Sequence, residues 1–170
     1  EGGTGAAKCG GNYAASMIAQ TEGEKHGCKQ VIFKDPHRGD AIEELGGMNV
    51  FFIFGKENKI VTPELTGTIL EGVTRSSLIQ LAKDRGMTVE ERAITLTEWR
   101  EGVANGDITE IFACGTAAVV APIGKLKAED FEIPAPTEHF GEISKSLREE
   151  LVGIQLGTVE DRHGWMTRLI

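Results

Sequence analysis

The chain has 170 residues, of which 40% are hydrophobic and 26% charged, so we expect one globular domain and exclude a disordered tail or a disulfide-stapled miniprotein. The net charge of -8 argues against a nucleic-acid partner, and no apolar run has the length of a membrane span. Three cysteines, odd in number and without metal-like spacing, indicate reduced thiols in a cytoplasmic protein with no metal site.

The first half of the chain predicts a helix followed by strands. From Asn12 to about Lys25, the apolar residues Tyr13, Met17 and Ile18 are spaced to form one stripe of a helix, which Gly27 would end. Apolar, β-prone runs predict strands at residues 30–34, 48–54 and 59–62. Residues 35–39 and 55–58 are predicted to be turns.

The second half predicts further alternation of helices and strands. Helices are expected at residues 74–85, from Thr95 or Thr97 to about Asn105, and at residues 144–156. The last of these would be capped by Glu142 or Ser144 and ended by Gly157. Strands are expected at residues 87–94, 110–113 and 117–121.

Three short runs carry the groups of a chemical site. They are AKCGGNY at residues 7–13, ELGGMN at residues 44–49 and CGTAA at residues 114–118. They supply an amine, a carboxylate and a set of backbone amides. A lysine that forms an imine with an aldehyde cofactor needs a carboxylate to keep the pyridine nitrogen protonated and amides to hold the phosphate. These roles together indicate pyridoxal 5'-phosphate.

In order and spacing, the runs resemble the C-terminal domain of the branched-chain amino acid aminotransferases, which are fold-type-IV pyridoxal phosphate enzymes. The similarity extends nearly from end to end. Further matching stretches are VTP at 61–63, GTILEGVTR at 67–75, EIFACGTA at 110–117 and GWM at 164–166. The resemblance implies an α/β (α+β) fold, in which helices flank a mixed β-sheet or pseudo-barrel.

The resemblance also implies a domain organisation. Residues 1–170 would form the C-terminal cofactor-binding domain. In the family, a smaller N-terminal domain precedes the lysine and contributes part of the active site, whereas only seven residues precede Lys8 here. We therefore expect the N-terminal domain to be absent from this chain, the isolated chain to be inactive, and the full-length enzyme to be a homodimer.

The family's site residues fall on matching positions of this sequence. Lys8 would carry the cofactor as an imine and move the substrate proton, Glu44 would face the pyridine nitrogen, and Tyr13 would lie near the cofactor hydroxyl. An aromatic in the helix core is an equally good interpretation of Tyr13. Amides at a helix N-terminus bind anions, and the positions that the resemblance assigns to the phosphate are Val73, Thr74 and Thr116. Thr116 and the amide of Ala117 are assigned to the substrate carboxylate.

The implied activity is transfer of the amino group between leucine, isoleucine or valine and 2-oxoglutarate. One alternative is another fold-type-IV enzyme, either a D-amino-acid aminotransferase or an aminodeoxychorismate lyase, although the ELGGMN and GWM stretches argue against both. The other is a non-catalytic module that binds a phosphorylated ligand through the same loops. In that module Lys8 and Glu44 would be incidental.

Overall fold

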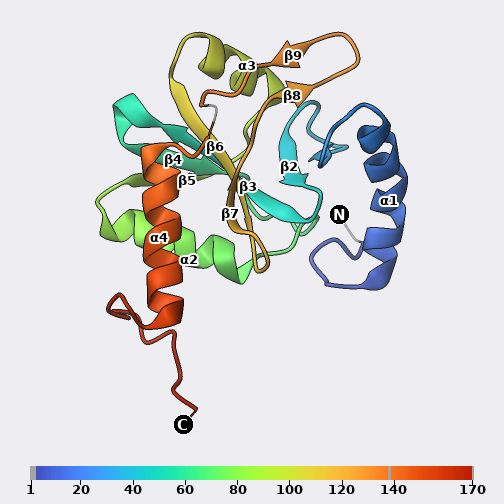
Figure 1. The fold of residues 1–170 in the computed structure, drawn as a ribbon. Helices are drawn as coiled ribbons and strands as arrows, with labels where there is room; N and C mark the ends of the chain where they lie inside the picture. Colours follow the sequence, from blue (N-terminus) through green and yellow to red (C-terminus); the bar gives the residue numbers. More distant parts are fainter. Residues whose placement is uncertain (1–2, 138, 170) are drawn as a thin grey trace.

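The structure is a computed structural model that describes residues 3–137 and 139–169 (Figure 1). Its helices are α1 (Gly10–Lys25), the short 3-10 helix η1 (Gly55–Glu57), α2 (Val73–Asp84), α3 (Leu96–Ala104) and α4 (Glu142–Leu156). Its strands are β1 (Ile32–Lys34), β2 (Ile42–Leu45), β3 (Met48–Phe54), β4 (Lys59–Thr62), β5 (Thr88–Glu91), β6 (Ile108–Gly115), β7 (Val119–Pro122), β8 (Leu126–Lys127) and β9 (Glu132–Ile133). None of the helices in these described ranges is both long and apolar enough to cross a membrane.

The sheet is mixed, as predicted, and strand β3 is its centre. It pairs antiparallel with β2 through its first residues, with β4 through its last residues, and with β6 along most of its length. Strand β7 pairs with β6, β1 pairs with β2, and β4 runs parallel to β5. The start of β3 therefore brings together β2, β6 and the segments that follow them.

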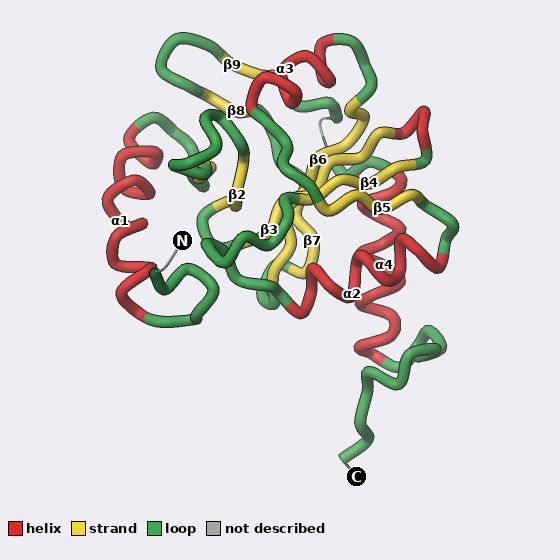
Figure 2. The backbone as a smooth tube through the Cα atoms, turned by 180° about the vertical axis from the view of Figure 1, so that it is seen from behind, coloured by secondary structure: helices red, strands yellow, loops and turns green. Residues whose placement is uncertain are grey.

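Alternating residues of β3 enter two cores on opposite faces of the sheet. On one face, Phe51 stacks on Phe112 at a ring distance of 5.0 Å, in the core to which α2 and α4 contribute. On the other face, Phe52 meets Trp99 of α3 edge-on at 5.2 Å, so Trp99 is a core aromatic. Figure 2 shows α3 and the β8–β9 hairpin at one end of the molecule, with α2 and α4 at the other.

Helix α1 has nearly the predicted bounds but does not bury its apolar stripe. No residue of α1 is buried, and Met17 and Ile18 are 66% and 80% exposed. In Figures 1 and 2 the helix stands to the side of β2 rather than against a face of the sheet. The spacing of apolar residues gave the helix its correct position, but it did not specify a covering partner.

The N-terminus of α4 differs from the prediction. The cap residue is Gly141, which makes no side-chain cap hydrogen bond, so the predicted cap at Glu142 or Ser144 is wrong. Instead the buried carboxylate of Glu110, on β6, accepts hydrogen bonds from the amides of Ile143 and Ser144 at 3.0 and 2.8 Å. A carboxylate from a distant strand therefore satisfies the helix end. The helix ends at Gly157 in the left-handed region, as expected.

Other departures are smaller. Strand β5 spans only Thr88–Glu91 of the predicted residues 87–94, and β2, β8 and β9 were not predicted. Of the two candidate caps for α3, Thr95 is correct, because its hydroxyl accepts a hydrogen bond from the Glu98 amide at 3.0 Å.

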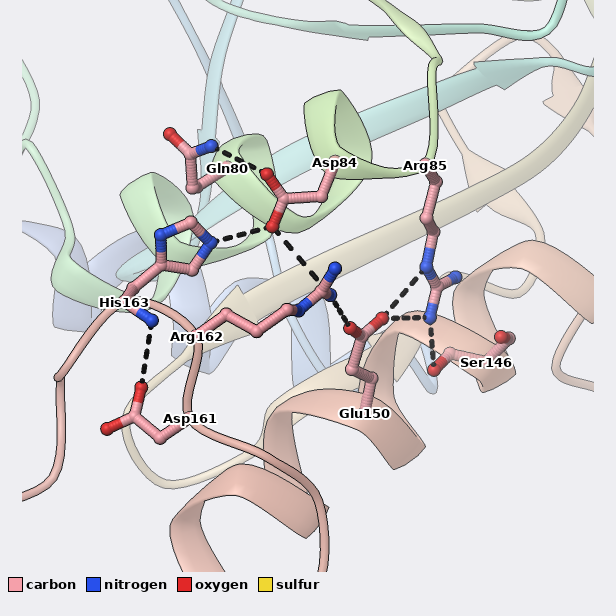
Figure 3. Close-up of polar contacts among 8 residues, drawn as sticks. All are labelled: Gln80, Asp84, Arg85, Ser146, Glu150, Asp161, Arg162 and His163. Carbon is pink, nitrogen blue, oxygen red and sulfur yellow. Dashed lines mark hydrogen bonds and ion pairs between the residues drawn. The ribbon is translucent and has the colours of Figure 1, made fainter.

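The segment after α4 turns back onto α2 and α4 through ionic contacts, shown in Figure 3. His163 Nε2 lies 2.6 Å from Asp84 Oδ2 at the end of α2. Arg162 donates to Glu150 of α4 at 2.6 Å, and the same carboxylate accepts from Arg85 Nε at 2.9 Å. We call residues 157–169 the C-terminal segment.

Candidate cofactor-binding cleft

A cleft of about 370 Å³ lies where α1 and the loop before it meet β1 and β2. The lining side chains that matter here are Tyr13, Lys34, Glu43, Glu44, Thr68 and Leu70. Clefts that bind small ligands start at about 300 Å³, so a small cofactor fits this one. It brings together two of the predicted site residues, Tyr13 and Glu44.

Glu44 lies half-buried on β2, opposite Asn49 of β3. Burial raises the pKa of its carboxyl, and the charge of the adjacent Glu43 raises it further. A cation at this position, such as a protonated ring nitrogen, would favour the carboxylate form and oppose both effects. Glu43 differs from Glu44 because it already accepts a hydrogen bond from the Thr68 hydroxyl.

Lys8 is exposed on the loop before α1, directly after the cleft-lining residue Ala7. The side-chain amide of Asn12 holds this loop by donating to the carbonyls of Thr4 at 2.7 Å and Ala7 at 2.9 Å. The loop also packs closely on the far wall, since a Cβ on Gly5 would lie 2.0 Å from the Thr68 carbonyl oxygen. The loop thus places the Lys8 backbone at the rim of the cleft.

Tyr13 lies in the first turn of α1 and is 38% exposed, so it is not a core aromatic. Its ring borders the β2–β3 turn, where a Cβ on Gly47 would lie 3.7 Å from Tyr13 Cε1. The Tyr13 ring is therefore in van der Waals range of the turn that follows Glu44.

The four residues assigned to phosphate and substrate lie outside the lining of this cleft. Val73 is exposed and Thr74 half-buried in the first turn of α2, and Thr116 and Ala117 are exposed in the β6–β7 turn. The cap of α2, Gly72, makes no side-chain cap hydrogen bond, so the first amides of the helix are available to an anion.

A buried cation lies behind this helix end. Arg75 is 3% exposed and donates through Nη2 to the Pro63 carbonyl and to Glu91, both at 2.9 Å, while its Nε has no hydrogen-bond partner within the described structure. Burial raises the pKa of the nearby Cys114 thiol to about 12, and the charge of Arg75 offsets this only in part. Cys114 is therefore a protonated, packed thiol, while the Arg75 charge favours an anion near α2.

Two asparagines of the site went unassigned at the sequence level. Asn12 holds the Lys8 loop, and Asn49 donates to the Leu70 carbonyl at 3.1 Å beside the cleft. Both stand inside the matching runs AKCGGNY and ELGGMN, but only their position in the fold reveals what they contact. A polar residue at the start of the apolar run 48–54 was the one available signal for Asn49.

Comparison with known proteins identifies the family. The model of the class IV amino-transferases matches residues 5–126, which include the cleft, the start of α2 and the β6–β7 turn. The chain belongs to this family. It is 52% identical over 170 residues to a branched-chain-amino-acid aminotransferase of Mycolicibacterium smegmatis, and 50% identical over 168 residues to a probable one of Streptomyces coelicolor. Each alignment covers 99% of this chain and 46% of the relative.

Solved structures give the same fold. The branched-chain amino acid aminotransferase of Escherichia coli superposes with a TM-score of 0.79 at 29% identity, over 96% of this chain and 50% of that one. The enzyme of Thermobaculum terrenum in its PLP form superposes with a TM-score of 0.76 at 30% identity, over 95% of this chain and 48% of that one. The chain spans about half the length of the curated relatives it matches.

Proposed function

We propose that this chain is the C-terminal, cofactor-binding part of a branched-chain amino acid aminotransferase, and that it binds pyridoxal 5'-phosphate. The enzyme exchanges amino groups between leucine, isoleucine or valine and 2-oxoglutarate. The observation that carries this proposal is the cleft itself. It places a half-buried carboxylate, a tyrosine and the lysine-bearing loop around a space of about 370 Å³.

The residues present fit this cofactor. Burial raises the pKa of the Glu44 carboxyl, and a neighbouring cation such as a ring NH would stabilise its charged form. The uncapped amides of α2 and the buried charge of Arg75 suit a phosphate. When bound, pyridoxal phosphate supplies an electron sink for the carbanion at the amino-acid α-carbon.

In this proposal the site residues divide the work of holding the cofactor, moving the proton and orienting the substrate. Lys8 holds the cofactor covalently and later moves the proton at the substrate α-carbon. Glu44 keeps the ring nitrogen protonated, and Tyr13 lies by the ring hydroxyl. The phosphate is held by the first turn of α2 and by the β6–β7 turn, through Val73, Thr74 and Thr116. Thr116 and the Ala117 amide orient the substrate carboxylate.

The decisive experiment reduces the pyridoxal phosphate-loaded full-length enzyme with borohydride and maps the labelled peptide. Lys8 is expected to carry the label. Lys34 is the rival, because it is the lysine among the residues that line the cleft. Lys8→Ala is expected to abolish transamination, whereas Lys34→Ala should leave most of it. A label on Lys34, or near-normal turnover of Lys8→Ala, would remove Lys8 from the mechanism.

The domain organisation has its own test. We propose that a separate N-terminal domain supplies further cofactor and substrate contacts, and that the full-length enzyme is a homodimer. The isolated chain should then bind pyridoxal phosphate poorly and transaminate little, although it has its own core. Activity of the isolated chain equal to that of the full-length enzyme would show that the other domain is dispensable.

A further inference from the structure

Asn49 lies between Glu44, on one wall of the cleft, and the segment that leads into helix α2. It is the second residue of β3, it is 7% exposed, and it pairs directly with Glu44 on β2 and with Cys114 on β6. Residues that face each other across antiparallel strands point to the same face, with Cβ atoms about 5 Å apart. Glu44, Asn49 and Cys114 thus form one row across three strands.

The side chain of Asn49 reaches from this row to the turn before α2. Its Nδ2 donates to the Leu70 carbonyl at 3.1 Å. Its Oδ1 occupies the space next to Gly72, because a Cβ there would lie 2.1 Å from that oxygen. Gly72 also has a φ of +71°, which favours glycine. The amide of Asn49 is therefore enclosed by the residues that lead directly into the first turn of α2.

We propose that Asn49 is a positioning residue that fixes the separation between Glu44 and the anion-binding turn of α2. The inference rests on the proposed function, in which these two groups hold opposite ends of one cofactor. A ligand with two binding ends gains affinity from both only if the two subsites are held at the right distance. Asn49 supplies that distance, because the same residue is paired to Glu44 and bonded to the turn.

A residue that only stabilised the fold would have a different effect. It would weaken both subsites, or the whole protein, without changing how strongly binding at one end assists binding at the other. The two roles therefore separate when three ligands are compared on the apoenzyme. Inorganic phosphate occupies the anion subsite, pyridoxal occupies the ring subsite, and pyridoxal phosphate occupies both.

The experiment measures the three dissociation constants by equilibrium dialysis on the full-length apoenzyme. The linkage ratio is the product of the phosphate and pyridoxal constants divided by the pyridoxal phosphate constant. Asn49→Ala is expected to lower this ratio by about tenfold or more, since the advantage of joining two ligands depends steeply on geometry. Asn49→Asp, which keeps the size but removes the donor, should lower it too. Its added charge largely cancels in the ratio.

Asn58 provides a matched control at the other end of α2. Its Nδ2 donates to the Gly86 carbonyl at 3.2 Å. Asn58 therefore joins the connection between β3 and β4 to the turn that follows α2, much as Asn49 joins β3 to the turn before α2. Asn58→Ala likewise removes a side-chain hydrogen bond to a backbone carbonyl, and it should leave the linkage ratio unchanged.

The outcomes separate this inference from the proposed function. A high ratio in the wild type that both Asn49 variants retain would overturn the positioning role and leave the cofactor assignment intact. A wild type that binds pyridoxal phosphate no better than phosphate alone would overturn the proposed function, and this inference with it. Equal losses in the Asn49 and Asn58 variants would reduce Asn49 to a structural residue.

Discussion

The imidazole of His163 lies 2.6 Å from the carboxylate of Asp84 and stacks on the indole of Trp165 at 4.8 Å. These contacts attach the C-terminal segment to the end of α2, while Arg162 and Glu150 attach it to α4 (Figure 3). Because polar side chains on the surface make these contacts, substitutions there should weaken the attachment of the segment without disturbing the core.

His163→Ala is expected to release the C-terminal segment locally. Loss of one hydrogen bond should increase the population of the locally opened segment. Tryptic cleavage after Arg162 should therefore be roughly three- to fivefold faster. His26→Ala is the control, because His26 forms an exposed pair with Glu22 on α1, far along the chain from this segment. Equal cleavage rates in both variants would show that the His163 contact does not hold the segment.

Acid should loosen the same segment. The hydrogen bond from His163 is the largest cause that lowers the pKa of Asp84, and backbone amides, Met166 first, lower the pKa of Asp161. A carboxyl with a lowered folded-state pKa stabilises the attachment above its usual value of 3.8 and loses that contribution as the pH falls through the folded pKa. Hydrogen exchange should therefore show falling protection of the Met166 amide below pH 3.8, and unchanged protection there would contradict the assignment.

Glu110→Ala should be costly although Glu110 is far in sequence from the helix it caps. It removes a buried charged acceptor of two amide hydrogen bonds, which should lower the free energy of unfolding by about 2–3 kcal/mol. Glu142→Ala, in the exposed first turn of α4, should cost only about 0.5 kcal/mol. Urea denaturation of both variants measures the two losses. A larger loss for Glu142→Ala than for Glu110→Ala would mean that Glu142, and not Glu110, stabilises the start of α4.

Glu44→Gln should slow the chemical step in the full-length enzyme more than it weakens substrate binding. In the proposed function this substitution removes a fixed charge that faces the ring nitrogen, and roughly a 10²-fold drop in kcat is typical for loss of such a group. Glu43→Gln is the neighbour control, since Glu43 already bonds Thr68. Steady-state kinetics that show no change, or the same loss for both, would mean that the register of the ELGGMN run is wrong.

Two glycines near Lys8 should respond oppositely to alanine. Gly5→Ala places a methyl group 2.0 Å from the Thr68 carbonyl oxygen, so the Lys8 loop must move and covalent attachment of the cofactor should decline. Gly10→Ala meets nothing within 4 Å and lies at the start of α1, so it should be neutral or stabilise by about 0.5–1 kcal/mol. Borohydride labelling and thermal melts of both variants measure the two effects.

The sequence predicted those strands whose residues have a high intrinsic β propensity. Residues 48–54 and 59–62 became β3 and β4 with the predicted bounds, because β-branched and aromatic runs enclose a polar turn. Strand β2 was missed because two of its four residues are glutamates, and its pairing with β1 and β3 is what makes it a strand. The cap of α4 was missed because Glu110 lies more than 30 residues away.

The site divides in the same way. The order and spacing of three runs predicted Tyr13 and Glu44, which the fold brings to one cleft. Lys8 is not one of the lining residues, but it directly follows Ala7, which is. The contacts of Asn12 and Asn49 join segments that only folding brings together, so no local pattern specifies them. Likewise, the spacing of Met17 and Ile18 predicted a helix, but spacing along the chain does not say which surface would cover their side chains.

The contrast between the two tryptophans of this chain makes them separate optical reporters. Trp99 is enclosed in the core against Phe52 and should emit at short wavelength, whereas Trp165 is 37% exposed and should emit at longer wavelength. The red edge of the emission band should therefore follow the C-terminal segment, where Trp165 stacks on His163, while the blue edge follows the β3 core. Intrinsic fluorescence can thus distinguish release of the C-terminal segment from global unfolding without an added label.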